Sequence, residues 1–330
     1  MTQKHSNISI FVPHIGCPNM CSFCNQRHIT GANKAPSQQD VIDAVEVAVN
    51  STRYNPKNTE IAFFGGSFTA INRNYMLSLL TAANYFVKNG TVSGIRISTR
   101  PDAIDDEILK ILKEYGVTSI ELGAQSLNDN VLLSNNRGHT ALEVENACKL
   151  IKKYKFNLGL QMMTGLYSDC NEYAISTAEK IIKLCPDTVR IYPTLVLKNT
   201  DLAALYSDNK YKPQTLEEAV DLCSNLLLMF EVANIKVIRL GLHSIEKDSY
   251  IAGPWHPAFS EICYSKLFLK KAIEMLKDSG EYLLFVNPKS ISKMIGQHKE
   301  NILTLKKLGF DCIVKSDNLL DESSIRVERR

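Results

Sequence analysis

The chain has 330 residues, of which 45% are hydrophobic and 22% charged, and its formal net charge is +3. This composition is typical of a globular protein with one large core, or with a core and a small appendage. No apolar run approaches the ~18 residues that span a bilayer, and the first residues lack the apolar stretch of a secretory signal. We therefore expect a cytoplasmic protein with no membrane partner.

Strand and helix signals alternate along the first two thirds of the chain. Apolar, β-branched segments predict strands at residues 8–12, 59–64, 94–98, 119–123, 157–163 and 188–192. Amphipathic segments predict helices at residues 36–49, 75–87, 105–114, 142–154 and 175–184. Six strand–helix units in succession predict an α/β fold with a parallel sheet.

Three closely spaced cysteines, Cys17, Cys21 and Cys24, follow the first predicted strand. Soft thiolate ligands suit zinc or an iron–sulfur cluster. Zinc would need a fourth ligand, for which the candidates are His14 and His28. A disulfide would leave one thiol over, and no signal for an oxidising compartment precedes it. The other six cysteines are scattered, and we expect them to be reduced thiols.

The string Cys-x3-Cys-x-Phe-Cys after a first strand resembles the cluster loop of the radical S-adenosylmethionine (SAM) enzymes. The resemblance implies that Cys17, Cys21 and Cys24 hold three irons of a [4Fe–4S] cluster, that the fourth iron binds SAM, and that Phe23 belongs to the cofactor site. It also implies a partial (β/α)6 barrel whose chemistry lies at the C-terminal ends of the strands. The implied reaction is reductive cleavage of SAM, which needs an electron donor such as flavodoxin or ferredoxin.

The glycine pair Gly65-Gly66 after the second predicted strand resembles the pair that meets the SAM amino group in this superfamily. Many members have a glutamate next, where this chain has Ser67. Ser98 and Gln161 stand where some relatives carry acidic ligands of the SAM ribose. The resemblance therefore assigns these five residues to the SAM site.

Two strings in the middle of the chain narrow the family: Glu121-Leu-Gly-Ala-Gln125-Ser126 and Asn136-Arg137-Gly138-His139-Thr140. They resemble the group that contains the Elongator catalytic subunit and the oxygen-independent coproporphyrinogen oxidases. By this resemblance Gln125 lies near the SAM ribose, and Arg137 pairs with the SAM carboxylate. A guanidinium suits that pairing because it offers a planar fork of donors.

Later strings resemble the Elongator-type subgroup specifically, and they lie at residues 191–202, 211–213, 239–243 and 252–259. The resemblance thus covers residues 8–260, and we expect a barrel domain at residues 1–260. Elongator-type proteins continue into a long acetyltransferase domain, whereas this chain ends at residue 330. The resemblance therefore does not by itself transfer acetyl-CoA-dependent carboxymethylation of uridine to this chain.

Residues 261–330 read as helix, strand, helix, tight loop, helix and strand, and they resemble a KH RNA-binding module. In that module a Gly-x-x-Gly loop clamps the nucleic-acid backbone, and here Lys299 replaces the second glycine. Between residues 289 and 315 six lysines face one glutamate and one aspartate, a basic cluster typical of phosphate binding. The predicted RNA-binding residues are Lys289, Lys293, Gly296, Gln297, His298 and Lys299.

The function that these patterns favour is radical SAM modification of an RNA base, in tRNA or rRNA, with no DNA partner. Two alternatives stay open at this point. The first is a radical SAM oxidoreductase that acts on a small molecule or a tetrapyrrole, and the second is an RNA-binding protein whose iron–sulfur cluster is structural or regulatory.

Overall fold

The computed structural model describes residues 5–12, 20–24, 35–52, 54–242 and 247–330. By its contacts the chain divides into two compact units, Met1–Pro213 with Ile235–Ala252, and Gln214–Asn234 with Gly253–Arg330. The predicted domains, residues 1–260 and 261–330, differ from these units in two ways. Gln214–Asn234 belongs to the second unit, and the later part of that unit begins at Gly253 instead of residue 261. Whether they fold as separate domains stays a prediction.

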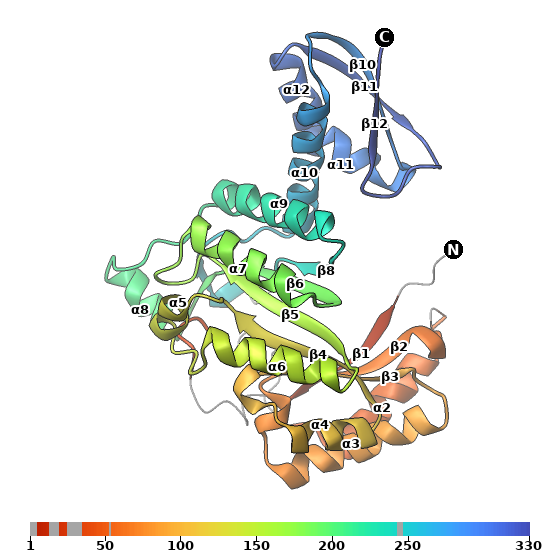
Figure 1. Ribbon diagram of the computed structural model, residues 1–330, viewed down its shortest axis with the longest axis vertical. Helices are drawn as coiled ribbons and strands as arrows, with labels where there is room; N and C mark the ends of the chain where they lie inside the picture. The colour runs from red at the N-terminus through yellow and green to blue at the C-terminus, as the bar shows by residue number, and fades with distance from the viewer. Residues whose placement is uncertain (1–4, 13–19, 25–34, 53, 243–246) are drawn as a thin grey trace. The chain divides into compact units, whose positions relative to one another are not determined.

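The first unit is built on a seven-stranded sheet in which all neighbouring strands run parallel and follow chain order, and Figure 1 shows that this sheet curls into a half-barrel. Its strands are β1 (Ser6–Val12), β2 (Thr59–Gly65), β3 (Gly94–Thr99), β4 (Val117–Gln125), β5 (Asn157–Thr164), β6 (Thr188–Pro193) and β8 (Lys236–Leu240). The six predicted strands and their parallel arrangement are confirmed. The seventh strand, β8, was not predicted, because charged and apolar residues mix in its five positions.

Helices cover the outer face of this sheet (Figure 1), and the five predicted ones are present. Capping boxes define where two of them begin, since Ser37 bonds reciprocally with Asp40 and Thr140 with Glu143. The helices are α2 (Gln38–Val49), α3 (Arg73–Lys88), α4 (Asp106–Glu114), α5 (Asp129–Ser134), α6 (Ala141–Lys153), α7 (Asn171–Leu184) and α8 (Asp201–Ser207). Strands β7 (Val196–Leu197) and β9 (Tyr250–Ala252) form a separate antiparallel pair.

The two faces of the half-barrel differ in chemistry. Side chains alternate between the faces of a strand, and those that point outward are apolar and fully buried, as Phe63, Ile97 and Leu122 illustrate. The inner face carries charges instead, which is unusual for a parallel sheet, whose strands are normally apolar on both faces. Its charged members include Glu60, Arg96, Glu121, Arg190 and Arg239.

Four of these charges form a ladder across the strands. Glu60 on β2 accepts hydrogen bonds from Arg96 Nε at 2.9 Å and from the Thr118 and Ser119 hydroxyls, and it lies 3.1 Å from a ring nitrogen of His5. These hydrogen bonds and the nearby positive charge of Arg96 hold the pKa of Glu60 at about 2, although burial alone would raise it.

The ladder continues from β3 through β4 to β6. Arg96 Nη1 lies 3.0 Å from Glu121 Oε1, and Arg190 Nε lies 2.6 Å from Glu121 Oε2. The Arg190 guanidinium also lies over the Phe64 ring, 5.2 Å from its centroid. Because three strands separate β2 from β6 in the sheet, this contact shows that the sheet curls until side chains meet across its interior.

The second unit packs one long helix, two short helices and a three-stranded sheet around one apolar core that includes Phe268, Leu284, Met294 and Leu305. Strand β10 lies in the middle of the sheet, parallel to β11 and antiparallel to β12. The helices are α9 (Leu216–Val232), α10 (Phe259–Met275), α11 (Ile291–Ile295) and α12 (Glu300–Lys307), and the strands are β10 (Gly280–Val286), β11 (Phe310–Ser316) and β12 (Ile325–Arg329). The predicted helix–strand–helix–loop–helix–strand order is thus present, and β12 is an addition to it.

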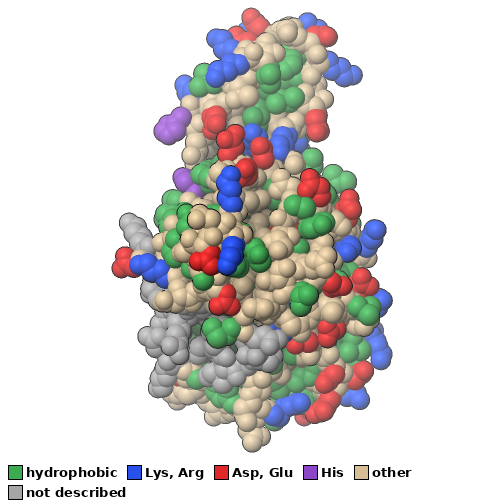
Figure 2. Space-filling model, turned by 90° about the vertical axis from the view of Figure 1, so that its left-hand side faces the viewer, with side chains coloured by type: hydrophobic (Ala, Val, Ile, Leu, Met, Phe, Trp, Pro, Cys, Tyr) green, Lys and Arg blue, Asp and Glu red, His purple; other side chains and the backbone are tan. Residues whose placement is uncertain are grey.

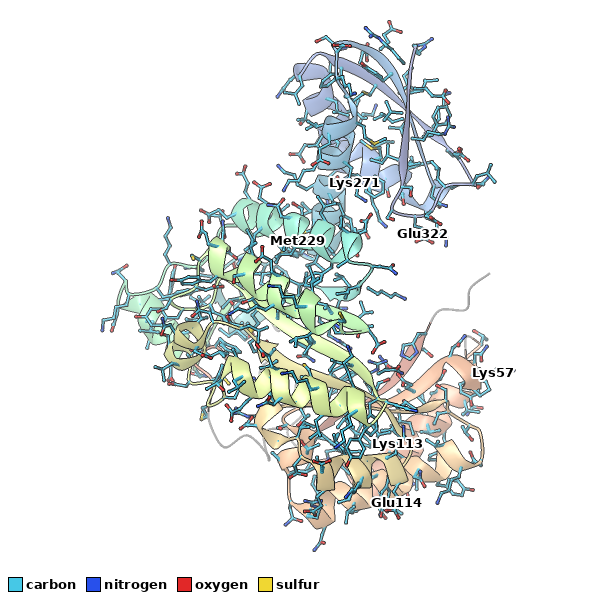
Figure 3. All side chains as sticks on the ribbon, in the orientation of Figure 1. Lys57, Lys113, Glu114, Met229, Lys271 and Glu322 are labelled. Atoms are coloured by element: carbon cyan, nitrogen blue, oxygen red, sulfur yellow. The ribbon has the colours of Figure 1, made fainter. Side chains whose placement is uncertain are left out.

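No described helix is long and apolar enough to cross a membrane. Figure 2 shows acidic and basic side chains interspersed over the face that it presents. In the second unit Lys271, labelled in Figure 3, pairs with Glu231 of α9 and donates to the Ser323 carbonyl at 2.9 Å. One lysine therefore joins α9, α10 and the segment before β12.

We predict that Arg96→Met lowers the free energy of unfolding by about 3–5 kcal/mol, because it leaves the buried Glu60 carboxylate without its guanidinium partner. The matched control is Arg73→Met, whose partner Glu107 is 74% exposed, and its cost should be about 1 kcal/mol or less. Urea unfolding of the two proteins followed by circular dichroism measures both values. Equal stability of the two variants would show that the ladder does not stabilise the half-barrel.

Candidate active site

The described part of the cysteine loop is the short segment from Met20 to Cys24, while Cys17, His14 and His28 lie outside the described residues. Cys21 is buried and Cys24 is half-buried. A turn holds them together, since the Cys24 N–H donates to the Cys21 carbonyl at 3.0 Å. Two of the three predicted cluster ligands are therefore adjacent on one turn.

Asn135, which the sequence analysis did not single out, fastens this loop to the barrel. The Ser22 N–H donates to the Asn135 carbonyl at 3.1 Å, and the Ser22 hydroxyl donates to Asn135 Oδ1 at 2.8 Å. The amide nitrogen of Asn135 donates in turn to the carbonyls of Val131 and Tyr167. Asn135 is fully buried, and these hydrogen bonds give partners to its backbone carbonyl and to both polar atoms of its side chain. Its position directly before the Asn136-Arg137 string was the one available signal.

Arg137 lies against the cysteine loop, and its predicted pairing with the SAM carboxylate stays a prediction. Its Nη1 donates to Cys21 Sγ at 3.1 Å, and its Nη2 donates to the Gly123 carbonyl at 2.6 Å. Arg137 therefore contacts one of the predicted cluster ligands directly. The structure thus joins two predicted site residues that are 116 positions apart in the sequence.

Gly65 ends β2 in a conformation that other residues rarely adopt, with φ at +111°. A Cβ atom there would lie 2.4 Å from the Val12 carbonyl oxygen, and the Gly66 N–H donates to that same oxygen at 2.9 Å. Glycine is therefore required at position 65 by the close approach of β1 and β2. This steric requirement does not depend on a ligand. The backbone of Gly65 and Gly66 lies beside the end of β1, which the cysteine loop follows in the sequence.

Ser67 connects the ends of two neighbouring strands. Its hydroxyl lies 2.8 Å from the Thr99 hydroxyl and accepts a hydrogen bond from the Arg100 N–H at 3.2 Å. The side chain is almost completely buried. In this chain Ser67 therefore organises the loops after β2 and β3, whereas its predicted contact with SAM stays a prediction.

Several predicted SAM residues have buried polar atoms without a hydrogen-bond partner among the described residues. These atoms are the Ser98 hydroxyl oxygen, Gln125 Oε1 and Arg137 Nε. Gln125 has a φ of +65°, and a Cβ on Gly123 would lie 2.9 Å from its Nε2, so the backbone turns here to make room for the amide. Buried polar atoms normally have partners, and these atoms therefore fit a polar ligand such as SAM.

Gln161 and Phe23 have protein partners in the structure. Gln161 Nε2 donates to Glu121 Oε2 at 3.1 Å and so joins the charged ladder. Phe23 packs against the apolar residues Val131, Met163 and Leu166. Phe23 therefore anchors the cysteine loop by hydrophobic contact, and the contacts of both residues with SAM stay predictions.

His139 is a buried residue of the site that the sequence analysis quoted but did not assign. Burial, aided by the positive charge of Arg137, lowers its pKa to about 4. Its Nε2 lies 3.3 Å from the Ala124 carbonyl, and its Nδ1 has no partner among the described residues. The ring is thus neutral at physiological pH and adds no charge beside the guanidinium.

The predicted RNA-binding residues all lie in the second unit. Lys289 pairs with Glu322, and Lys293 lies over the Tyr264 ring, 5.1 Å from its centroid. Gly296 begins a loop that passes through His298 and Lys299, where φ is +79°, +49° and +65° respectively. The backbone at Lys299 therefore has the left-handed conformation that glycine adopts most easily.

We predict that Asn135→Ala lowers the iron content of the anaerobically reconstituted protein, because Ser22 loses the partner that holds the cysteine loop. The matched control is Asn130→Ala, an exposed asparagine on the same helix, which should retain the wild-type iron content. Iron per chain and the thermal midpoint are measured for both variants. Full iron loading of Asn135→Ala would show that the loop does not need this anchor.

Comparison with known proteins agrees with this geometry. Residues 11–181, more than half of the chain, match the radical SAM superfamily, and residues 186–268 match the radical SAM C-terminal domain. The tRNA uridine(34) acetyltransferase of Dehalococcoides mccartyi (strain CBDB1) is 23% identical over 240 residues, which are 62% of this chain and 52% of that protein. Human Elongator complex protein 3 is 30% identical over 192 residues, which are 52% of this chain and 35% of that protein. The chain thus spans about half or less of the length of these two relatives.

An uncharacterized protein of Methanocaldococcus jannaschii is 24% identical and covers 84% of this chain and 81% of its own length. Among solved structures, the archaeal Methanocaldococcus infernus Elp3 with an N-terminal deletion has a TM-score of 0.66 at 20% identity, covering 82% of this chain and 64% of that one. At this identity the likeness concerns the fold. The family match decides between the alternatives that the sequence left open for the cysteine loop: the chain belongs to the radical SAM superfamily, and it is a radical SAM enzyme whose cofactors are a [4Fe–4S] cluster and SAM.

Proposed function

We propose that this enzyme modifies a base of an RNA, in tRNA or rRNA, by radical SAM chemistry. The observation that carries the proposal is the similarity of its barrel to proteins whose names state that they act on uridine 34 of tRNA. Acetyl transfer is not part of the proposal, because the chain matches only 52% of the Dehalococcoides relative.

Cys17, Cys21 and Cys24 would hold the cluster. SAM would lie against the polar atoms at the ends of β2, β3 and β4, with the predicted contacts Phe23, Gly65, Gly66, Ser67, Ser98, Gln125, Arg137 and Gln161. When bound, the cluster and SAM would supply radical chemistry for hydrogen abstraction. The protein binds and orients these cofactors and the substrate, and it excludes water from the site.

The residues around Cys21 have distinct parts in this arrangement. Asn135 fixes the loop, and Arg137 offers a positive charge to the sulfur and, through its unpaired Nε, a further donor to the SAM carboxylate. His139 is neutral there and adds no charge of its own. The buried amide of Gln125 presents an acceptor, Oε1, that suits a ribose hydroxyl.

The second unit is proposed to bind the RNA backbone through the loop from Gly296 to Lys299. The buried side chain of Asn301 steadies this loop, since its amide nitrogen donates to the carbonyls of Lys293 and Met294 and to Ser265. A preorganised loop loses little conformational entropy when it binds, and the surrounding lysines supply positive charge for phosphates. The proposed partners are therefore an RNA and an electron donor such as flavodoxin or ferredoxin, in the cytoplasm.

Mass spectrometry of nucleosides from tRNA and rRNA, isolated from cells with and without the gene, tests the proposal. A modified nucleoside that disappears with the gene supports it. Unchanged nucleosides, together with release of 5′-deoxyadenosine from SAM by the dithionite-reduced enzyme, would favour the small-molecule or tetrapyrrole oxidoreductase instead.

We predict that Gly65→Ala weakens SAM binding by roughly tenfold, equivalent to about 1.4 kcal/mol, because the new Cβ would push β2 away from the Val12 carbonyl. Gly90→Ala is the matched control: Gly90 also has a positive φ, +75°, but a Cβ there meets no atom within 4 Å. Equilibrium binding of SAM to the reconstituted proteins is the measurement. Wild-type affinity of Gly65→Ala for SAM would show that the glycine pair does not belong to the SAM site.

We predict that reversing the charges of Lys289, Lys293 and Lys299 to glutamate weakens RNA binding and flattens its salt dependence. The log–log slope should change by roughly 0.7 for each single-strand phosphate contact that is lost. The control is a triple reversal of exposed lysines in the first unit, Lys57, Lys88 and Lys110, of which Lys57 is labelled in Figure 3. Both proteins should still cleave SAM, and an unchanged slope in the first variant would remove the second unit from RNA recognition.

A further inference from the structure

The last strand of the half-barrel contains a bulge that turns one arginine inward. Strand β8 pairs with β6 so that Val237 lies opposite Val189 and Arg239 lies opposite Arg190, which leaves Ile238 as an extra residue. Without the extra residue, Arg239 would stand on the outer face, where Val189 is buried. The bulge moves it to the inner face instead. Bulges often re-aim a side chain next to an active site.

The two neighbouring arginines have unequal partners. Arg190 donates from Nη2 to Glu121 Oε1 at 2.7 Å, and its Nε forms an ion pair with Oε2 at 2.6 Å. Arg239 donates its Nε–H to the Gly241 carbonyl at 3.2 Å, and its terminal N–H groups have no acceptor among the described residues. Arg239 is therefore a surplus cation on the inner face.

Like charges opposite each other on adjacent strands destabilise a sheet. Burial and the positive charge of Arg190 accordingly lower the pKa of Arg239. Within the described part of the chain, only Arg190 of these two neighbouring guanidinium groups has a carboxylate partner, which leaves Arg239 able to accept an anion from outside.

Tyr192 adds a neutral donor at the same place. It lies two residues after Arg190 on β6 and therefore on the same face, and its hydroxyl is 3.4 Å from Arg190 Nη1. Burial raises the pKa of Tyr192, so the hydroxyl keeps its proton at physiological pH and can donate it to an anion. Two guanidinium groups and one hydroxyl thus border the same part of the inner face.

We propose that Arg239, Arg190 and Tyr192 form an oxyanion subsite inside the half-barrel and that a phosphate group of the substrate occupies it. Guanidinium forks match the oxygens of a phosphate or a carboxylate, and hydrogen bonds of this charged kind are the strong ones. The choice of phosphate rests on the proposed function, because every nucleotide of an RNA carries one. The subsite itself follows from the bulge, the surplus charge and the hydroxyl.

The test is labelling of the reconstituted full-length enzyme with phenylglyoxal, a reagent for free guanidinium groups, followed by peptide mass spectrometry. The probes are inorganic phosphate and acetate, with sodium chloride at equal ionic strength as the reference. Arg239 should label faster than Arg96, which lies between two carboxylates. Phosphate at ten times its dissociation constant should slow the labelling of Arg239 about tenfold.

Labelling of Arg239 that neither anion slows would overturn the subsite. Protection by acetate but not by phosphate would overturn the assignment to a phosphate and indicate a carboxylate-bearing small molecule. Protection by phosphate, and by a short oligoribonucleotide at lower concentration, would support the proposal in full. These readouts do not depend on turnover, so the subsite can fail while the nucleoside analysis supports RNA modification, and the reverse outcome is equally distinguishable.

Variants provide a second, independent measurement. Arg239→Gln should weaken the binding of inorganic phosphate, measured by calorimetry, about tenfold, as expected for the loss of a charged donor. Arg239→Lys should recover part of it, since lysine keeps the charge without the fork. The control is Lys236→Gln, which removes an exposed charge from the same strand and should bind phosphate as the wild type does. Equal affinity in Arg239→Gln and Lys236→Gln would contradict the proposal.

Discussion

The ion-pair ladder of Glu60, Arg96, Glu121 and Arg190 is the interaction on which the rest of the barrel depends. A charge on the inner face of a parallel sheet is costly unless a partner and hydrogen bonds compensate it, and here each carboxylate has several donors. The partners come from four different strands, so the ladder is satisfied only when all of these strands have the correct register. Buried ion pairs can specify an arrangement more than they stabilise it, and the single register seen here agrees with that function.

A polar inner face also explains why the site is where it is. The carboxyl ends of the parallel strands meet at one edge of the sheet, and the glycine pair, Ser67, Gln125 and Arg137 all lie in loops at that edge or beside it. The ladder uses the charges in the middle of the strands, whereas polar atoms nearer the edge, on Ser98, Gln125 and Arg137, have no partner among the described residues. The same sheet therefore combines an ion-paired ladder in the middle of its strands with an edge whose buried polar atoms fit a polar cofactor.

The second unit follows a different logic. Its core is apolar and its sheet is small, and its distinctive feature is a loop in which His298 and Lys299 both have positive φ. Non-glycine residues in this region of conformational space cost free energy and often occur at functional sites. Asn301 holds the loop with hydrogen bonds to carbonyls before it, so the loop shape is built into the unit. Such a loop, with lysines beside it, is what the proposed binding to an RNA backbone would need.

The sequence by itself determined six strands, five helices, the cysteine loop and the family, because each depends on a local pattern of hydrophobicity, capping or spacing. It did not reveal β8, the assignment of α9 to the second unit, the anchor Asn135 or the ladder. Glu121, for example, is 25 residues from Arg96 and 69 from Arg190, and no pattern in the sequence around it predicts those contacts. The inward position of Arg239 depends on one extra residue in the pairing of two strands. Only the tertiary structure decides such features, because they arise from register and from contacts between residues that are far apart in the sequence.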